Sequence, residues 1–154
     1  ARFKDAFPDW KYEKITRENI LEAWEMNLQW REKNDTGESE GLALESRMVD
    51  NAFSHYWEEN LVGGLLRAGG RVVAFTFGSP VTDDTCDVQV EKAFAEIQGA
   101  YPMINQQFVL HETEGFSYIN REDDMGDEGL RRAKLSYYPA FFYERYEAME
   151  RKTV

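Results

Sequence analysis

The sequence predicts an α+β fold in which a mixed, mainly antiparallel sheet is flanked by helices in a three-layer sandwich. Two segments with helical spacing of apolar residues come first along the chain. Two strand-like runs joined by a short glycine-containing connection follow, and such a hairpin pairs its strands antiparallel. Helix-like and strand-like segments then alternate to the end of the chain, so the predicted fold is not a doubly wound parallel sheet.

The first helix is predicted to begin at Thr16, whose side chain is of the type that caps helices, with Glu18 in the first turn. Its apolar positions are Ile20, Leu21, Trp24 and Leu28. A polar loop over residues 32–41 contains two glycines and joins this helix to a second one. The apolar stripe of the second helix consists of Leu44, Met48, Val49, Ala52, Phe53, Tyr56 and Trp57.

The periodicity changes after the second helix. Residues 61–67 and 71–78 are strand-like runs on either side of Ala68-Gly69-Gly70, which predicts a hairpin. In the next segment apolar residues alternate with polar ones, which predicts a strand with one buried face. The apolar positions are Cys86, Val88 and Val90, and the polar ones are Asp87, Gln89 and Glu91.

The rest of the chain predicts a helix, a strand, a second helix and a final strand. Residues 101–111 have helical spacing, and Pro102 suits a first helical turn because that position needs no N–H. Residues 116–120 predict a strand, and Asp127 is predicted to cap a helix that Pro139 ends. That helix has Leu130, Ala133, Lys134 and Tyr137 near one face. Residues 140–146 predict a last, aromatic strand.

Composition limits the classes of function. The 154 residues suit one domain with a sizeable core. A net charge of −11 argues against binding to DNA or to anionic lipid, since both depend on many Lys or Arg contacts to phosphate. No apolar run is long enough for a membrane span, and the N-terminus has no secretory signal. The single cysteine, Cys86, excludes an internal disulfide framework and a cysteine-rich zinc site, so we expect a cytoplasmic protein.

Four segments in the second half of the chain carry a family resemblance. They are Gln98-Gly99-Ala100-Tyr101, Ile104-Asn105-Gln106, residues 119–126 and residues 129–139. Together they resemble the phosphatidylglycerol lysyltransferase C-terminal-like family, a largely bacterial group within the GNAT acyltransferase superfamily, many of whose members have no known activity. The predicted order of helices and strands is also similar to that of the GNAT fold.

The resemblance implies that residues 1–154 form a single GNAT-like domain. Members of the family commonly carry another GNAT-like half before this one. Since the chain also begins without Met, we expect it to be the C-terminal half of a longer tandem protein.

In GNAT folds a central strand splays from its neighbour, and an acyl carrier inserts at the gap. Backbone N–H groups at the start of the next helix face the phosphates of that carrier. The resemblance places Gln98, Gly99, Ala100 and Tyr101 at this helix start, so they are the candidate cofactor-binding residues, and acyl-CoA is the implied cofactor. The alternative is that Gly99 only turns the strand into the helix.

Glu91 is the candidate general base, because transfer to an amine requires a group that accepts a proton. Alternatively it forms an ion pair with Lys92 or Lys134, or is simply exposed. By analogy with Fem-type peptidoglycan aminoacyltransferases, Lys134 is the candidate for stabilising an oxyanion, and its alternative is a salt bridge to Glu91 or Glu122. Tyr137, or its neighbour Tyr138, is the candidate that protonates the leaving group, and the alternative for either residue is packing.

Three further residues are candidates for binding substrate. Asn120 and Arg121 end a predicted strand, where side chains can orient a carboxylate or phosphate, Arg through its bidentate guanidinium. Asn105 is predicted to share a helix face with apolar residues, so it must be hydrogen-bonded, either within the fold or to a substrate. The acidic residues at 122–124 are expected to cap a helix and not to bind a metal, since consecutive side chains point in different directions.

These candidates favour an enzyme that moves an acyl or aminoacyl group from CoA or an aminoacyl-tRNA to an amine or hydroxyl. Its partners are then the acyl donor, the acceptor and the preceding GNAT-like domain. The alternative is a non-catalytic binding or scaffolding half-domain that keeps the GNAT-like fold but has lost the carrier loop.

Overall fold

The computed structural model describes residues 2–34, 37, 40–122 and 128–142. It contains two compact parts, which meet in the sequence between Glu122 and Asp123 and are described separately. The elements of the first part are α1 (Arg2–Ala6), β1 (Lys11–Lys14), α2 (Ile20–Asn34), α3 (Glu40–Ser54), β2 (Val62–Ala68), β3 (Arg71–Pro80), β4 (Thr85–Ala93), α4 (Ala100–Glu112) and β5 (Tyr118–Asn120). The second part contains α5 (Glu128–Leu135). None of the helices among the described residues combines the length and apolar character needed to cross a bilayer.

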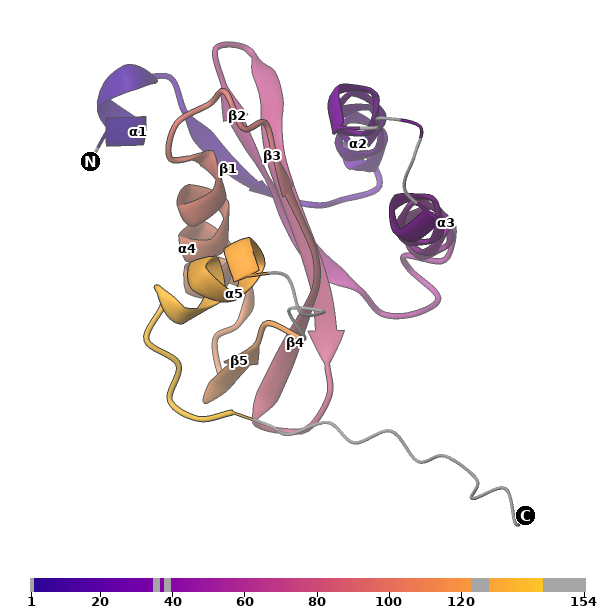
Figure 1. The fold of residues 1–154 in the computed structure, drawn as a ribbon, viewed down its shortest axis with the longest axis vertical. Helices are drawn as coiled ribbons and strands as arrows, with labels where there is room; N and C mark the ends of the chain where they lie inside the picture. The colour runs from indigo at the N-terminus through magenta and orange to yellow at the C-terminus, as the bar shows by residue number, and fades with distance from the viewer. Residues whose placement is uncertain (1, 35–36, 38–39, 123–127, 143–154) are drawn as a thin grey trace. The chain divides into compact units, whose positions relative to one another are not determined.

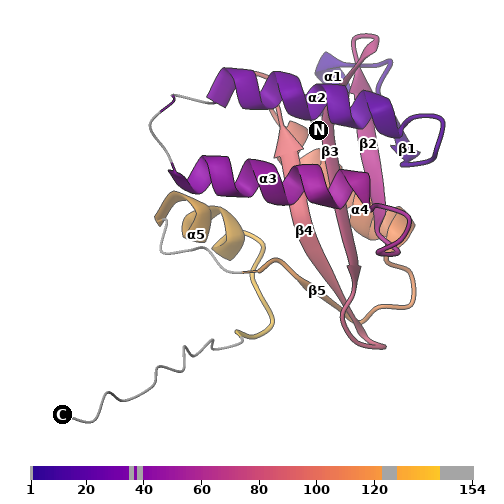
Figure 2. The same cartoon turned by 90° about the vertical axis from the view of Figure 1, so that its right-hand side faces the viewer.

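The first part is built on one five-stranded sheet (Figure 1). Its strand order is β1-β2-β3-β4-β5, and neighbouring strands are antiparallel except for the parallel pair β4–β5. Helix α4 lies against one face of the sheet, and α2 and α3 lie against the other (Figures 1 and 2). This arrangement confirms the predicted three-layer α+β sandwich with a mixed, mainly antiparallel sheet.

The predicted hairpin is the β2–β3 pair, and its turn explains two of the glycines. Gly69 and Gly70 have φ angles of +59° and +76°. A tight two-residue hairpin turn requires such left-handed conformations, and glycine adopts them without a steric penalty. The two strands are buried along most of their length, because helices cover both faces of the sheet.

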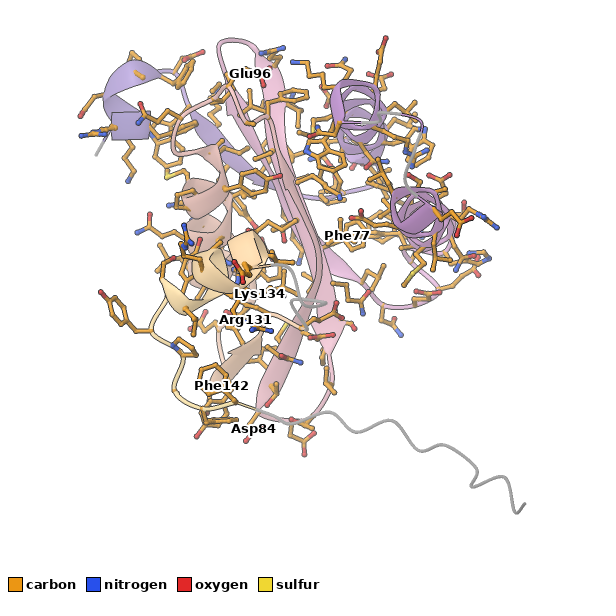
Figure 3. All side chains as sticks on the ribbon, viewed as in Figure 1. Phe77, Asp84, Glu96, Arg131, Lys134 and Phe142 are labelled. Carbon is orange, nitrogen blue, oxygen red and sulfur yellow. The ribbon has the colours of Figure 1, made fainter. Side chains whose placement is uncertain are left out.

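A cluster of aromatic side chains packs α3 against the sheet. Phe77 of β3 lies on the side that faces α3 (Figure 3) and is edge-on to Phe53, with ring centroids 5.3 Å apart, and to Tyr56, at 5.7 Å. Phe75 packs against the same Phe53 ring at 5.4 Å. Each such pair adds about 0.5–1.5 kcal/mol beyond the burial of its area, so the group stabilises the contact between helix and sheet.

The two predicted N-terminal helices are confirmed as α2 and α3, but α2 begins at Ile20 and not at Thr16, and α3 ends at Ser54, before two of its predicted apolar residues. Several residues of the predicted apolar faces are also exposed. The exposed members of those faces are Leu21, Leu28, Leu44 and Met48. The sheet side of α2 is made by the smaller or more flexible Ala23 and Met26, and α3 buries Val49. Each helix buries only a narrow stripe of residues against the sheet, so the apolar residues on either side of that stripe remain in contact with water.

Sequence analysis missed α1 and β1. Strand β1 has the sequence Lys-Tyr-Glu-Lys, and four residues with one aromatic side chain give no periodic signal. The last predicted helix is confirmed as α5. The predicted final strand is wrong for residues 140–142, which are not in a strand, while 143–146 and the predicted cap Asp127 lie outside the described residues.

A partly buried tyrosine, Tyr12, and a buried one, Tyr56, give opposite predictions for removal of the hydroxyl group. Tyr12 donates a hydrogen bond of 3.1 Å to the Glu112 carboxylate, whereas the Tyr56 hydroxyl is buried and has no acceptor among the described residues. Burial raises the pKa of both phenols, so both stay protonated at neutral pH. We expect Tyr12→Phe to lower the free energy of unfolding by about 1–3 kcal/mol and Tyr56→Phe to raise it by up to about 1 kcal/mol. Urea denaturation measures both changes, and equal losses in the two variants would contradict the assignment.

Candidate functional site

A β-bulge in β4 decides which side chains of that strand face α4. Gly78 of β3 pairs with Val88, but the preceding Phe77 pairs with Val90. Strand β4 therefore has one extra residue, Gln89, at this point. A single inserted residue shifts the alternation of side chains between the two faces and increases the local twist.

The bulge changes the faces predicted for this strand. Cys86 and Val88 pack together with α4, but Val90 packs in the main core cluster, so the predicted strict alternation is wrong. After the bulge, Glu91 points toward α4 and contacts Asn105. Burial raises the pKa of the Cys86 thiol, which is consistent with a core residue and not with a nucleophile.

The sheet opens between β4 and β5. The two strands pair over three positions, from Thr85 with Tyr118 to Asp87 with Asn120. Among the described residues no strand pairs with the rest of β4, residues 88–93, on the β5 side. Within the described residues the backbone groups along this edge have no strand partner, and such edges are where extended ligands add a strand in other proteins.

Three of the candidate site residues meet beside this opening. Arg121, directly after β5, donates hydrogen bonds to the Glu91 carboxylate, 3.0 Å from Nη2 to Oε1 and 3.5 Å from Nη1 to Oε2. Asn105 of α4 donates from Nδ2 to Glu91 Oε2 at 3.2 Å. The side chains of Glu91 and Arg121 are 11% and 23% exposed, so the pair is mostly withdrawn from water.

These contacts hold the Glu91 carboxylate in one orientation. A carboxylate offers about four lone-pair positions. Arg121 and Asn105 occupy three of them. One lone-pair position on Glu91 therefore has no donor among the described residues, while Arg121 and Asn105 fix the orientation of the carboxylate.

The ion pair of Glu91 is made with Arg121 and not with Lys92. Lys92 follows Glu91 in the strand, so it points to the opposite face of the sheet, where its ammonium group pairs with Glu45 of α3. Lys134 belongs to the second part of the chain, on α5 (Figure 3), and Tyr137 follows the end of that helix. The roles of Lys134 and Tyr137 therefore remain predictions.

Asn120 takes part in the turn after β5. Its Oδ1 accepts a hydrogen bond of 3.1 Å from the backbone N–H of Glu122, which has a φ angle of +56°. A contact of this kind shapes the turn that carries Arg121 toward Glu91. In the part of the chain that the structure describes, no three potential metal ligands lie together. Residues 123–124 of the acidic run lie outside that part, so the absence of a metal remains a prediction.

Helix α4 begins at the predicted place. Gly99 is its N-cap with a φ angle of +84°, and Ala100 is fully buried. A side chain at Gly99 would press on Phe3 of α1, with the two Cβ atoms 3.2 Å apart, so α1 packs against the start of α4. Gln98 and Tyr101 are exposed.

The first turn of α4 offers few donors to a phosphate. The N–H groups of Ala100 and Met103 are bonded to backbone carbonyls, and Pro102 has none, which leaves the N–H of Tyr101 without an acceptor among the described residues. The nearby Glu96 (Figure 3) forms an ion pair with a lysine of α2, and the hydrogen bond from that lysine lowers the pKa of Glu96. A diphosphate at a helix start is usually held by several N–H groups. This turn therefore fits one phosphate or carbonyl oxygen better than it fits the diphosphate of CoA.

Comparisons with known proteins agree with this architecture. The family model described as phosphatidylglycerol lysyltransferase, C-terminal, matches residues 1–149. No curated protein matches the chain. A conserved protein of unknown function from Bacteroides thetaiotaomicron VPI-5482 is similar at 43% sequence identity and a TM-score of 0.86, over 91% of this chain and 47% of that one. The chain thus spans about half the length of that protein.

Two acetyltransferase structures are similar in fold at low sequence identity. A ribosomal-protein-alanine N-acetyltransferase from Brucella melitensis biovar Abortus 2308 is 12% identical with a TM-score of 0.61, over 91% of this chain and 99% of that one. AAC(6')-Iy in complex with the bisubstrate analog CoA-S-monomethyl-acetylneamine is 9% identical with a TM-score of 0.57, over 94% of this chain and 99% of that one. At these identities the likeness concerns the fold alone. Because the family model covers residues 1–149, the chain belongs to the phosphatidylglycerol lysyltransferase C-terminal family, and it has the fold of the GNAT acetyltransferases.

Proposed function

We propose that this chain is the transferase half of a longer tandem protein, which moves an acyl or aminoacyl group from CoA or an aminoacyl-tRNA to an amine or hydroxyl. One observation carries the proposal: Arg121 and Asn105 hold the Glu91 carboxylate beside the edge where β4 and β5 separate. The family and the fold support the class of reaction. Both donors are cytoplasmic molecules, so the proposal includes a cytoplasmic location in a bacterial cell.

In this proposal each residue has a stated task. Glu91 takes the proton of the acceptor amine as its nitrogen forms the new bond to the carbonyl carbon. Lys134 stabilises the negative charge that develops on the carbonyl oxygen. Tyr137 gives a proton to the sulfur or oxygen that leaves when the bond to the carrier breaks. The edge of β4 positions the arm of the donor, which enters as an additional extended segment.

The two donors make different demands on the protein. An aminoacyl-tRNA needs a basic surface, which a chain with a net charge of −11 does not supply by itself. The relative from Bacteroides is about twice as long, and a preceding GNAT-like half would provide that surface. Acyl-CoA needs donors for its diphosphate, and the first turn of α4 has only the Tyr101 N–H to offer among the described residues.

Thermal denaturation of the full-length protein with a panel of donors tests the proposal. The panel contains acetyl-CoA, CoA, a non-hydrolysable aminoacyl-adenosine and free amino acids. A donor present at about 100 times its dissociation constant should stabilise the folded protein by about 2.7 kcal/mol. Stabilisation by one class of donor identifies the carrier. If no donor in the panel stabilises the protein, the non-catalytic binding or scaffolding half-domain becomes the better explanation.

A further inference from the structure

A second polar site lies on the face of the sheet opposite Glu91. A small, partly open hollow is present there between α2, α3 and β4. Its polar lining includes Asn27, Arg31, Glu45 and Lys92, and the ring of Trp30 forms one wall. None of these residues belongs to the proposed transfer site.

Lys92 brings a buried positive charge to this hollow. The residue is 6% exposed, and its ammonium group lies 3.7 Å from the centroid of the Trp30 ring and pairs with the Glu45 carboxylate. A buried cation needs an anion, because an uncompensated charge away from water is strongly unfavourable. The Glu45 side chain is 47% exposed, so this carboxylate can turn into solvent while the lysine stays buried.

Asn27 also lines this hollow and carries a buried hydrogen-bond donor that has no partner among the described residues. The residue is 2% exposed, and its Nδ2 is buried without an acceptor among the described residues. A buried amide donor without a partner costs about 1–3 kcal/mol. A ligand oxygen that takes the place of the Glu45 carboxylate within hydrogen-bond distance of Nδ2 would satisfy this donor.

Arg31 contributes a charge that is already balanced. Its guanidinium donates to the Asp50 carboxylate, at 2.6 Å from Nη2 and 3.5 Å from Nη1, and to the carbonyl oxygen of Ser46 at 3.3 Å. When Glu45 turns outward, the hollow therefore holds one unbalanced positive charge, that of Lys92. The hollow then favours a ligand that carries one negative charge and has oxygen atoms that accept hydrogen bonds.

We propose that the hollow binds a small monocarboxylate, and that Glu45 occupies the place of this ligand in the free protein. The ligand carboxylate accepts hydrogen bonds from the Lys92 ammonium group and from Asn27 Nδ2, and the Trp30 ring contacts its apolar part. Binding displaces the Glu45 carboxylate into solvent. The proposal goes beyond the transfer function and does not depend on it.

Titration of the full chain with sodium acetate tests this proposal, with acetamide at matched ionic strength as the neutral isostere. The readout is the indole N–H resonance of Trp30, assigned with Trp30→Phe. We expect acetate to shift this resonance saturably and acetamide to leave it unchanged. Glu45→Gln removes the internal competitor and should tighten acetate binding by about tenfold. Lys92→Met should abolish the acetate effect.

The Lys33–Glu96 pair supplies a matched control. It is also a lysine–glutamate pair, but both side chains are about half exposed, at 45% and 50%. Glu96→Gln should therefore leave the affinity for acetate unchanged. If Glu45→Gln does not fold, Glu45→Asp, which shortens the competing carboxylate, provides the same comparison.

Three results would overturn the proposal. The first is that acetamide shifts the Trp30 resonance as acetate does. The second is that the Lys92→Met variant still binds acetate. The third is that acetate binds the Glu45→Gln variant but not the wild type. That result would make Glu45 a permanent structural partner of Lys92.

Discussion

Replacement of Glu91 by Gln is expected to lower the rate of group transfer by about 10²–10⁴-fold, the range of a lost general base. Gln keeps the size of the side chain and one oxygen that accepts from Arg121, but its amide cannot accept the proton of the attacking amine. The affinity for the donor should not change, because in the proposed site the donor contacts the edge of β4 and the start of α4 and not Glu91. Single-turnover kinetics with the donor identified by thermal denaturation measures the rate.

Two further measurements separate a catalytic Glu91 from a structural one. The acidic limb of the wild-type pH–rate profile should be absent in the Glu91→Gln variant, which a purely structural role would not produce. Glu13→Gln is the matched control, because Glu13 also forms an ion pair on the same sheet, with Arg67 at 2.6 Å, but far along the strand order from the site. It should keep the wild-type rate. A Glu91→Gln variant that also keeps both the rate and the pH profile would remove Glu91 from the catalytic mechanism.

The sequence predicted the members of this site better than their arrangement. Glu91, Asn105 and Arg121 were each predicted as site residues, and the structure brings all three into contact. The contact itself could not be predicted, because strict alternation places Glu91 on the polar face with Asp87. The bulge at Gln89 moves Glu91 to the α4 face, and an inserted residue leaves no mark in a short alternating pattern.

The long periodic helices were predicted well, whereas the short N-terminal elements α1 and β1 were missed. The helices α2, α3 and α4 each give a periodic signal over many residues, and the β2–β3 hairpin is marked by the two glycines of its turn. Sequence analysis did not find the hollow next to α2 and α3, and it considered Lys92 only as a partner of Glu91. The hollow depends on Asn27 and Glu45, which are distant from Lys92 in the sequence and are brought near it only by the packing of both helices on the sheet.

Gly78→Ala is expected to lower the free energy of unfolding by about 3 kcal/mol, the upper end of the cost of overpacking. A Cβ atom at this position would overlap the carbonyl oxygen of Asp87 and lie 2.9 Å from its carbonyl carbon and 3.2 Å from Val88 Cα. These are backbone atoms of the neighbouring strand, so no side-chain rotation can relieve the collision. Urea denaturation monitored by tryptophan fluorescence measures the loss.

The control for Gly78 is Gly115→Ala, which separates a collision from a conformational preference. Gly115 has a φ angle of +95° but no atom within 4 Å of the added Cβ, so its substitution should cost only about 1–2 kcal/mol. Equal losses in the two variants would contradict the collision.

Gly78 also pairs with Val88 at the bulge, so its substitution has a second consequence, for function. If the strands separate to admit the methyl group, the bulge shifts and Glu91 no longer meets Arg121 and Asn105. A folded Gly78→Ala protein should therefore lose transfer activity although none of the proposed catalytic side chains has been changed.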